Sequence, residues 1–287
     1  MKFVRFTLGE DARLGLVHEN GVIDLTRASD GHLPADMLTF LQQGEAALDL
    51  ARQLEHSTPP DLALSEVKLL APIANPSKVV AIGLNYMDHC REQKVEPPKA
   101  PLIFSKFSTA IIGPGEAIRW DPALTSQVDF EAELAVVIGR TARNVTEAEA
   151  LDYVAGYTIC HDVSARDLQF SDGQWVRGKS LDTFCPLGPY LVTTDEIPDP
   201  HALAIRCMVN ETVMQNSNTS EMIFRIPYLI AYITRAFTLL PGDVITTGTP
   251  DGVGVFRKPK VFLKDGDVVT IEIEGLGQLT NPCQEER

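Results

Sequence analysis

One stretch near the middle of the chain alternates acidic and other residues and then becomes wholly apolar. Residues 128–139 read VDFEAELAVVIG. Successive side chains of a strand point to opposite faces, so Asp129, Glu131 and Glu133 share one face, with the glutamate Cβ atoms about 6–7 Å apart. The apolar continuation predicts a mostly buried strand, where unpaired charge is costly. A divalent cation fits between such carboxylates, and a solvated strand end is the alternative.

The composition is that of a globular chain with an acidic surface. The 287 residues are 44% hydrophobic, enough for the core of one large domain or two ordinary ones. Asp and Glu number 39 against 25 Lys and Arg, which gives a formal net charge of −14. Nucleic acids and anionic membranes attract basic surfaces, so we expect neither as a partner. The expected partner is a small molecule.

The N-terminus and the cysteines bear on the cellular compartment. The opening MKFVRFTLGE lacks the continuous apolar stretch of a secretory signal peptide, and no apolar run is long enough to span a bilayer. A cytoplasmic location is the expected default. The odd number of cysteines and the lack of a C-x-x-C pair argue against a disulfide framework or a zinc site. We expect reduced thiols at Cys90, Cys160, Cys185, Cys207 and Cys283.

The chain divides by pattern into two parts, and the expected fold class is α+β, mainly β. Residues 1–70 predict a small α+β domain of short strands and helices. Residues 71–287 predict a mainly β domain of many short strands punctuated by Gly and Pro. Two helices are expected to cover its sheet: 145–154, which opens on a Thr and a Glu at capping-box spacing, and 225–237, with apolar residues at helical spacing.

Residues 173–180, GQWVRGKS, match the G-x-x-x-x-G-K-[ST] pattern of phosphate-binding loops. Such a loop needs a buried strand before it and a helix after it, so that backbone N–H groups and the helix dipole converge on the phosphates. Here RDLQFSD precedes the pattern, and LDTFCPLGPY, with two prolines, follows it. We therefore predict that this segment binds no nucleotide.

A polar cluster ends the apolar strand YVAGYTIC. The segment CHDVSARDLQ places His161, Asp162, Arg166, Asp167 and Gln169 at a strand terminus, a position that commonly lines a site. The structural alternative is that Asp162 caps a turn while Arg166 and Asp167 form a local ion pair. With the two glutamates of the alternating strand, Asp162 would complete a set of hard oxygen ligands suited to Mg²⁺ or Mn²⁺.

Two further segments carry candidate residues. GLNYMDHCREQ follows the apolar KVVAI and places His89 and Glu92 three apart, on one face of a helix. A carboxylate beside an imidazole fixes its tautomer and raises its basicity, as a general base requires, while a surface contact is the alternative. LLPGDVITTGTPDGVG joins a strand to a Gly-rich turn in which we expect Thr246, Thr247 and Thr249 to be exposed. The turn either lets a substrate approach the backbone closely or is a plain β-turn.

Five segments in order resemble the fumarylacetoacetate hydrolase (FAH) family and its acylpyruvase-like branch: AIGLNYMDHCRE, DFEAELAVVIG, GYTICHDVSARDLQ, RGKSLDTFCPLGPYLVT and LLPGDVITTGTPDGVG. The resemblance runs over residues 72–283. It implies that residues 71–287 form an FAH-type catalytic domain, a mixed β-sandwich roll, and that residues 1–70 form a small, variable α+β domain. It also implies a homodimer, which is common in the family.

The same resemblance implies roles for single residues. The implied ligands of Mg²⁺ or Mn²⁺ are Glu131, Glu133 and Asp162. The implied substrate or oxyanion contacts are Arg166, Gln169 and Thr249. The implied catalytic residues are His89, Glu92 and Lys179. In the acylpyruvase-like branch, the His–Glu pair lies on a mobile lid and activates water.

The resemblance favours metal-dependent hydrolysis of the C–C bond of a 2,4-dioxo acid, such as an acylpyruvate, fumarylpyruvate or a 2,4-diketo-3-deoxy sugar acid. A water deprotonated by His89 and oriented by Glu92 would attack C4, and the metal and Lys179 would stabilise the departing pyruvate enolate. The other product would be a carboxylic acid. Oxaloacetate decarboxylation and keto–enol isomerisation in aromatic catabolism stay open, because both need the same enolate without an activated water. The alternative of another class is a non-catalytic, acidic metal-binding module.

Overall fold

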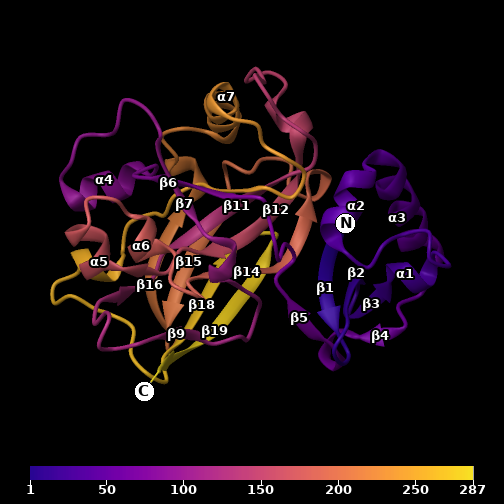
Figure 1. Cartoon of the computed structure of the whole chain (residues 1–287), viewed down its shortest axis with the longest axis horizontal. Helices are drawn as coiled ribbons and strands as arrows, with labels where there is room; N and C mark the ends of the chain where they lie inside the picture. Colours follow the sequence, from indigo (N-terminus) through magenta and orange to yellow (C-terminus); the bar gives the residue numbers. More distant parts are fainter. Residues whose placement is uncertain (287) are drawn as a thin grey trace.

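The computed structural model describes residues 1–286, and its first 70 residues form a small sheet with helices packed on it (Figure 1). The strands of this part are β1 (Lys2–Thr7), β2 (Ala12–His18), β3 (Gly21–Asp24), β4 (Leu62–Ala63) and β5 (Lys68–Leu70). Its helices are α1 (Leu25–Ala28), α2 (Met37–Gln43) and α3 (Glu45–Ser57). The Asp36 carboxylate caps α2 by accepting from the Thr39 N–H, as a polar residue before an apolar helix predicts.

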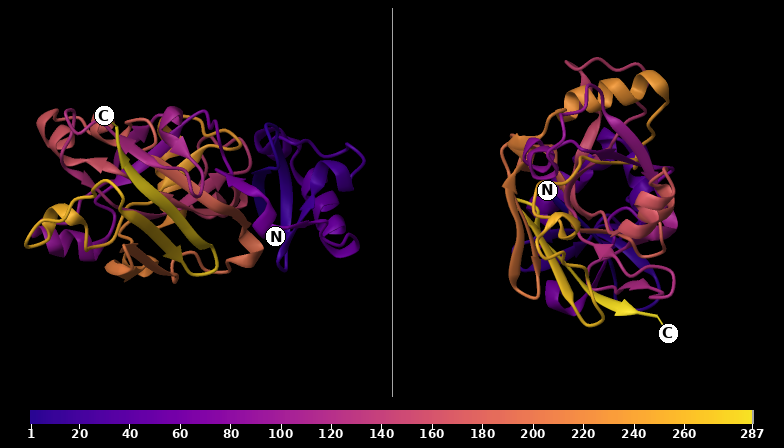
Figure 2. Two further views of the ribbon diagram at one scale, coloured as in Figure 1. Left: turned by 90° about the horizontal axis from the view of Figure 1, so that it is seen from below. Right: turned by 90° about the vertical axis from the view of Figure 1, so that its left-hand side faces the viewer.

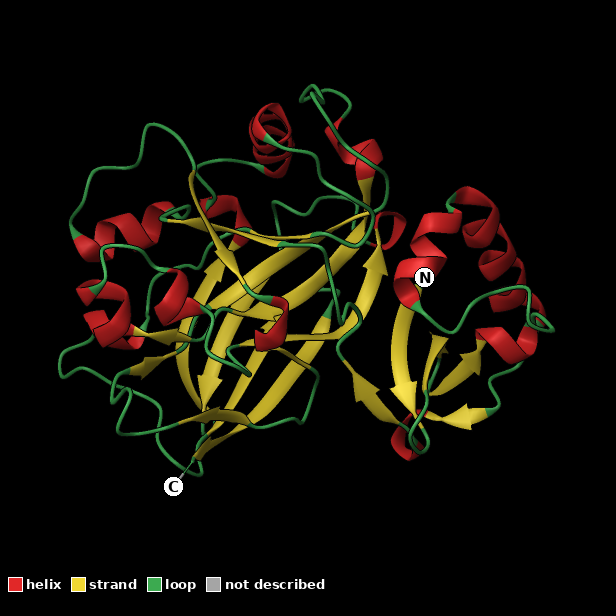
Figure 3. Cartoon of the chain, in the orientation of Figure 1, coloured by secondary structure: helices red, strands yellow, loops and turns green. Residues whose placement is uncertain are grey.

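The rest of the chain is rich in strands that curl around a common axis (Figures 2 and 3). Its strands are β6 (Val79–Gly83), β7 (Leu102–Lys106), β8 (Ile111–Ile112), β9 (Ile118–Trp120), β10 (Val128–Asp129), β11 (Ala132–Ile138), β12 (Val154–His161), β13 (Ser164–Ala165), β14 (Cys185–Thr193), β15 (Ala204–Val209), β16 (Thr212–Asn218), β17 (Val244–Thr246), β18 (Val268–Ile273) and β19 (Gly277–Glu285). Its helices are α4 (Met87–Gln93), α5 (Arg166–Ser171), α6 (Val176–Lys179) and α7 (Ile226–Ala236). The expected α+β class, mainly β, is confirmed.

The largest sheet runs without interruption through both parts of the chain. Its strand order is β4-β3-β2-β1-β14-β12-β11-β17-β6-β7, with β5 paired to β1 and β8 paired to β14. The antiparallel pair of β1 and β14 joins the two parts, with Lys2 opposite Val192. A second sheet has the order β16-β15-β18-β19-β9, and β10 pairs with β13. The predicted domain boundary at residue 70 stays a prediction.

Apolar periodicity explains where the two largest cores lie. Helix α7 buries Ile226, Leu229, Ile230 and Ile233, spaced three and four apart, against the core of the strand-rich part. A second core combines residues of β1, β2 and α2 with Ala135, Val137 and Cys160 of β11 and β12, so it spans both parts of the chain. Within residues 1–286 no helix is both long and apolar enough to cross a membrane.

Two local expectations are wrong. Residues 145–154 form no α-helix, although Thr146 Oγ1 does donate to the Glu149 carboxylate at 2.6 Å, and only a short 3-10 turn follows at Ala150–Tyr153. The turn is short because β12 begins at Val154, where the chain enters the sheet. Residues 128–139 form two strands, β10 and β11, separated by Phe130 and Glu131.

Candidate active site

The ends of neighbouring strands bring three carboxylates together. Strand β11 carries Glu133 opposite Cys160 of β12, and Asp162 follows β12 directly. The Asp162 N–H donates to the Glu131 carbonyl at 3.0 Å, which fixes the break between β10 and β11 beside the end of β12. One oxygen from each of Glu131, Glu133 and Asp162 lies within 4.8 Å of the others, and all three residues are buried. We call these three residues the acidic triad.

Asp129 does not join the triad, although the alternating pattern put it on the same face. The break in the strand turns its side chain toward another segment, where it accepts from the N–H groups of Gly254 at 2.7 Å and Val255 at 3.0 Å. It also accepts from Arg166 Nε at 2.8 Å. Asp129 therefore holds in place both the loop after β17 and the side chain of Arg166, one of the substrate-contact candidates.

The Arg166 guanidinium is buried at the start of α5 and lies at the centre of a hydrogen-bond network. Besides Asp129, it donates to Glu131 Oε1 at 2.6 Å and to Gln169 Oε1 at 3.0 Å. The local ion pair with Asp167 is not formed, because Asp167 instead accepts from the Thr125 hydroxyl at 2.6 Å. The sequence-predicted Arg166 and Gln169 thus lie beside the triad.

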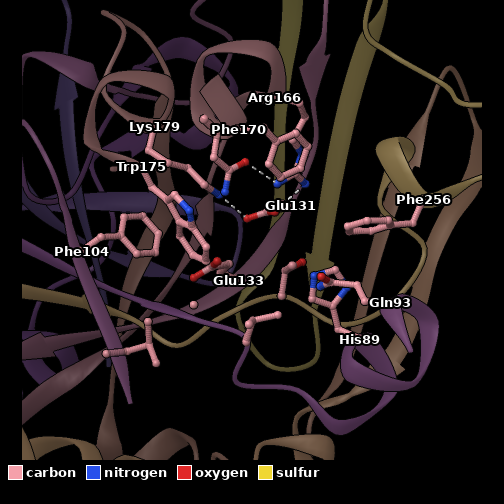
Figure 4. Close-up of a pocket in the computed structure, with 15 residues that line it drawn as sticks. His89, Gln93, Phe104, Glu131, Glu133, Arg166, Phe170, Trp175, Lys179 and Phe256 are labelled. Atoms are coloured by element: carbon pink, nitrogen blue, oxygen red, sulfur yellow. Dashed lines mark hydrogen bonds and ion pairs between the residues drawn. The ribbon is translucent and has the colours of Figure 1, made fainter. Parts of the chain in front are cut away.

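Lys179 ends the four-residue helix α6 and points into the triad. Its ammonium donates to Glu131 Oε2 at 2.6 Å (Figure 4). It also donates to Asp162 Oδ2 at 2.9 Å. Residues 173–180 follow helix α5 rather than a buried strand. The lysine of the phosphate-loop pattern is therefore engaged with carboxylates, and the strand-loop-helix frame of a nucleotide site is missing from residues 166–180.

The charges of the cluster fit a bound cation. Burial alone would raise the pKa of Glu131, but Lys179 and Arg166 outweigh it and lower that pKa to about 2. Burial and the neighbouring Asp162 and Glu131 raise the pKa of Glu133 well above its usual range. Its carboxylate accepts from the Gly248 N–H at 2.9 Å. The converging oxygens of the triad are the kind of ligands that a hard divalent cation prefers, and such a cation would favour the ionised form of Glu133.

Helix α4 places His89 and Glu92 at the opposite side of the pocket. His89 Nδ1 lies 3.0 Å from Glu92 Oε2, and the other Glu92 oxygen accepts from the Gly252 N–H at 3.0 Å. The His89 ring meets Phe256 edge-on, with centroids 5.8 Å apart. In Figure 4, His89 and Phe256 lie across Glu131 and Glu133 from Phe104 and Trp175. The predicted His–Glu pair is formed, with His89 buried and Glu92 partly buried, rather than being an exposed surface contact.

An aromatic wall closes the other end of the pocket. Phe104 and Trp175 meet edge-on with centroids 5.4 Å apart. The indole rests on the backbone at the end of β6, where a Cβ on Gly83 would lie 2.4 Å from Trp175 Cζ3. The cavity measures about 80 Å³. Thr249, the third substrate-contact candidate, also lines it and accepts from Gln215 Nε2 at 2.8 Å.

Sequence reasoning missed Lys106, Gln93 and Gln215. Lys106 is a lysine with a side chain 0% exposed, and its ammonium donates to Asp162 Oδ1 at 2.5 Å. Its only signal in the sequence is that it directly ends the apolar strand PLIFSK. Gln93 lines the pocket from α4, one residue after Glu92. Gln215 lies on β16, for which the sequence offered no expectation, and it accepts from the Ala132 N–H at 2.9 Å.

Known proteins resemble this chain over its full length. The oxaloacetate tautomerase of Xenopus laevis, named as a mitochondrial protein, is 52% identical over 98% of this chain and 90% of its own. The solved fumarylacetoacetate hydrolase of Exiguobacterium antarcticum is 37% identical, with a TM-score of 0.86 and 100% of both chains covered. A solved maleylpyruvate hydrolase of Sphingobium, in complex with manganese(II) and pyruvate, is 30% identical, with a TM-score of 0.82 and 100% of both chains covered.

These relatives correct one expectation and strengthen another. The predicted cytoplasmic location is wrong, because relatives at 52% identity, that of Xenopus laevis among them, are named mitochondrial. The missing apolar stretch argued only against a secretory signal, and it left other destinations open. The manganese-bound neighbour and the buried acidic triad both point to divalent-metal binding. The homodimer stays a prediction.

A family model carries the identification. Residues 78–284 match the model described as the C-terminal domain of fumarylacetoacetate hydrolase. The match includes the acidic triad, Lys179 and the His89–Glu92 pair, and it agrees with the range of the resemblance seen in the sequence. The chain therefore belongs to the fumarylacetoacetate hydrolase family of enzymes.

Proposed function

We propose that the chain is a metal-dependent tautomerase that interconverts the keto and enol forms of a short 2-oxo dicarboxylic acid, oxaloacetate being the first candidate. The observation that carries the proposal is the position of His89, a buried imidazole across one small pocket from Lys179 and the acidic triad. The two tautomers differ only in whether one proton is on C3 or on the C2 oxygen. A base on one side and positive charge on the other are the groups that such a proton transfer requires.

The base is held in one orientation. Glu92 accepts from His89 Nδ1, which leaves Nε2 as the proton acceptor of the neutral imidazole. Because the second Glu92 oxygen is bound to the Gly252 N–H, the carboxylate is itself fixed. We assign to His89 Nε2 the removal of the C3 proton when the enol forms and the delivery of a proton to C3 when the keto form is restored. In the same step the C2 oxygen takes a proton from the Lys179 ammonium, or returns it in the reverse direction, and exchange with solvent restores both side chains.

The opposite side of the pocket supplies charge. A divalent cation held by Glu131, Glu133 and Asp162 would polarise the 2-oxo group as a Lewis acid. The Lys179 ammonium donates to carboxylate oxygens of Glu131 and Asp162. It would also donate to the C2 oxygen of the substrate, on which negative charge develops.

Gln169 supplies a contact for a substrate carboxylate. Its Oε1 accepts from Arg166, so its NH₂ group is the part that is free to donate into the pocket. The Arg166 nitrogens are themselves bound to Asp129, Glu131 and Gln169. Arg166 therefore acts by holding these side chains in place.

Two further observations support a small 2-oxo acid. The cavity of about 80 Å³ is far smaller than the roughly 300–1,000 Å³ of sites for drug-sized ligands. The relatives named oxaloacetate tautomerases match 98% of this chain at 52% identity. Both favour a four-carbon acid over the longer dioxo acids that the sequence alone suggested.

Hydrolysis of a 2,4-dioxo acid is the second candidate. The same His89–Glu92 pair could deprotonate a water for attack on C4, and the neighbour that binds manganese and pyruvate is a maleylpyruvate hydrolase. Decarboxylation of oxaloacetate needs only the charge-stabilising side of the pocket. Decarboxylation would therefore give the His89–Glu92 pair no role, and we rank it below tautomerisation and hydrolysis.

The test follows the two reactions separately. Enol oxaloacetate is added to protein loaded with Mg²⁺ or Mn²⁺, and its conversion to the keto form is followed by ultraviolet absorbance against the spontaneous rate. The same preparations receive a panel of 2,4-dioxo acids with enzymatic detection of pyruvate. We expect metal-dependent acceleration of the tautomerisation, which is retained in His56→Ala, a control at an exposed histidine. If pyruvate is released from a dioxo acid while no 2-oxo dicarboxylate is tautomerised, the hydrolase replaces the tautomerase.

A further inference from the structure

Lys106, at the end of β7, is a buried charged side chain beside the acidic triad, and the proposed reaction assigns it no role. The strand pairs with β6, with Lys106 opposite Val79, and the side chain is 0% exposed. A buried ammonium is costly unless hydrogen bonds and opposite charge compensate it. The groups that compensate the Lys106 ammonium therefore indicate its role.

The Lys106 ammonium has three N–H donors and three acceptors. It donates to Asp162 Oδ1 at 2.5 Å, to the Val163 carbonyl at 3.3 Å and to the Lys179 carbonyl. An ammonium carries three donors, so its hydrogen-bonding capacity is filled. The acceptors belong to two separate segments, the turn after β12 and the end of helix α6. Lys106 therefore fastens these segments to each other.

The two carboxylate oxygens of Asp162 accept from different lysines. Oδ1 accepts from Lys106, while Oδ2 accepts from Lys179 at 2.9 Å. Lys179 is in turn held at both ends, its carbonyl by Lys106 and its ammonium by Asp162 and Glu131. The contacts form a closed ring of Lys106, Asp162 and Lys179, in which the side chains of Lys106 and Asp162 are 0% exposed and that of Lys179 is 2% exposed.

We propose that Lys106 is a positioning residue of the active site. It orients the Asp162 carboxylate so that Oδ2 alone faces the pocket, and it sets the backbone from which the Lys179 ammonium reaches that oxygen. The inference rests on the proposed function for the use of Lys179, but the geometry of Lys179 can be measured without metal or substrate. A neutral donor could not replace Lys106, because the cluster would then lose one of its three cations.

The test compares Lys106→Met with Lys78→Met. Lys78 also pairs with a buried carboxylate, that of Asp243 at 2.5 Å, but it lies outside the active site, which makes it a matched control. Ammonium signals are recorded by NMR on metal-free protein labelled with ¹⁵N-lysine, and Lys179→Met identifies the Lys179 signal. We expect that signal to be protected from solvent exchange in the unmodified protein and in Lys78→Met, and to be lost in Lys106→Met. With metal and oxaloacetate, kcat of Lys106→Met should fall by about 10–100-fold, as is typical when a residue that orients a metal ligand is removed.

The NMR result keeps this inference separate from the proposed function. A folded Lys106→Met variant that retains the protected Lys179 signal overturns the positioning role, whatever reaction the enzyme catalyses. If no tautomerase activity exists but the signal is lost, the positioning role stands and the proposed function fails. Should Lys106→Met not fold, Lys106→Met/Asp162→Asn is compared with Asp162→Asn, because no unpaired carboxylate is then left buried. A Lys179 signal unchanged between those two variants also overturns the proposal.

Discussion

Substitution of Gly83 by alanine tests whether the aromatic wall is fixed by the strand beneath it. The new Cβ would lie 2.4 Å from Trp175 Cζ3 and 3.0 Å from Trp175 Cη2. Carbon atoms in contact lie about 3.5–4.0 Å apart, so the indole must move by about 1 Å or more. Strand β6 is buried between β17 and β7, whereas Trp175 is only partly buried, so we expect the indole to yield rather than the backbone.

The cost follows from the contacts that are lost. Overpacking of this kind costs about 1–3 kcal/mol. Each kcal/mol lowers the Tm of a chain of this size by about 2–4 °C. Because the displaced indole also loses its edge contact with Phe104, the wall of the pocket changes shape. We therefore expect a higher KM for the substrate as well as a lower Tm.

Thermal unfolding, Trp fluorescence and steady-state kinetics together check this prediction. Gly9→Ala is the matched control, since a Cβ there meets no atom within 4 Å and the backbone is not left-handed. Gly83→Ala/Trp175→Phe should regain part of the lost stability, because the smaller ring relieves the clash. The reasoning is refuted if Gly83→Ala has the Tm, fluorescence and KM of the unmodified protein, or if the costs of the two substitutions simply add.

Three further outcomes are expected. His89→Ala should lower tautomerisation by about 10²–10⁴-fold, the range for a lost general base, while any decarboxylation of oxaloacetate falls much less; equal losses in the two assays would contradict the role of His89. Because the pKa of Glu133 is raised, metal binding should displace a proton from this carboxyl group. Metal affinity should therefore rise by up to about tenfold per pH unit below that pKa. Calorimetry in buffers of different ionisation enthalpy should detect the released proton, and Glu133→Gln should abolish its release. ATP should not bind at residues 173–180, and an ATP signal that disappears in Lys179→Met would show that it does.

Local patterns in the sequence indicated which carboxylates come together and that His89 pairs with Glu92, while their roles as metal ligands and catalytic residues stay predictions. The alternation of residues 128–139 pointed to Glu131 and Glu133, and the end of an apolar strand pointed to Asp162. Each of these signals is local, because a strand face or the end of a strand can be seen within a few residues. Helix α7 was predicted for the same reason, since the spacing of its apolar residues describes a face that must be buried.

Long-range contacts explain what the sequence did not predict. Nothing near Lys106 shows that its ammonium will meet Asp162, 56 residues away, and a lysine is ordinarily exposed. Asp129 left the predicted face because the strand breaks after it, at Phe130 and Glu131, and its carboxylate accepts from the distant N–H groups of Gly254 and Val255. At residues 145–154 the capping contact formed but the helix did not, because the start of β12 determined the backbone there.

The sheet that β1 and β14 share has a consequence for building chimeras of this family. The family match begins at residue 78, yet β14 pairs on one side with β1 and on the other with β12, which ends at the active site. A fragment that starts near residue 78 would leave β14 as an open edge and would uncover the apolar surface that Phe3 and Leu16 now cover. A transplanted N-terminal unit must therefore bring a strand that continues the sheet in the same register, with a residue in place of Lys2 opposite Val192. The junction of a chimera should therefore be chosen so that the pairing of β1 with β14 is kept, and not at residue 78, where the sequence match begins.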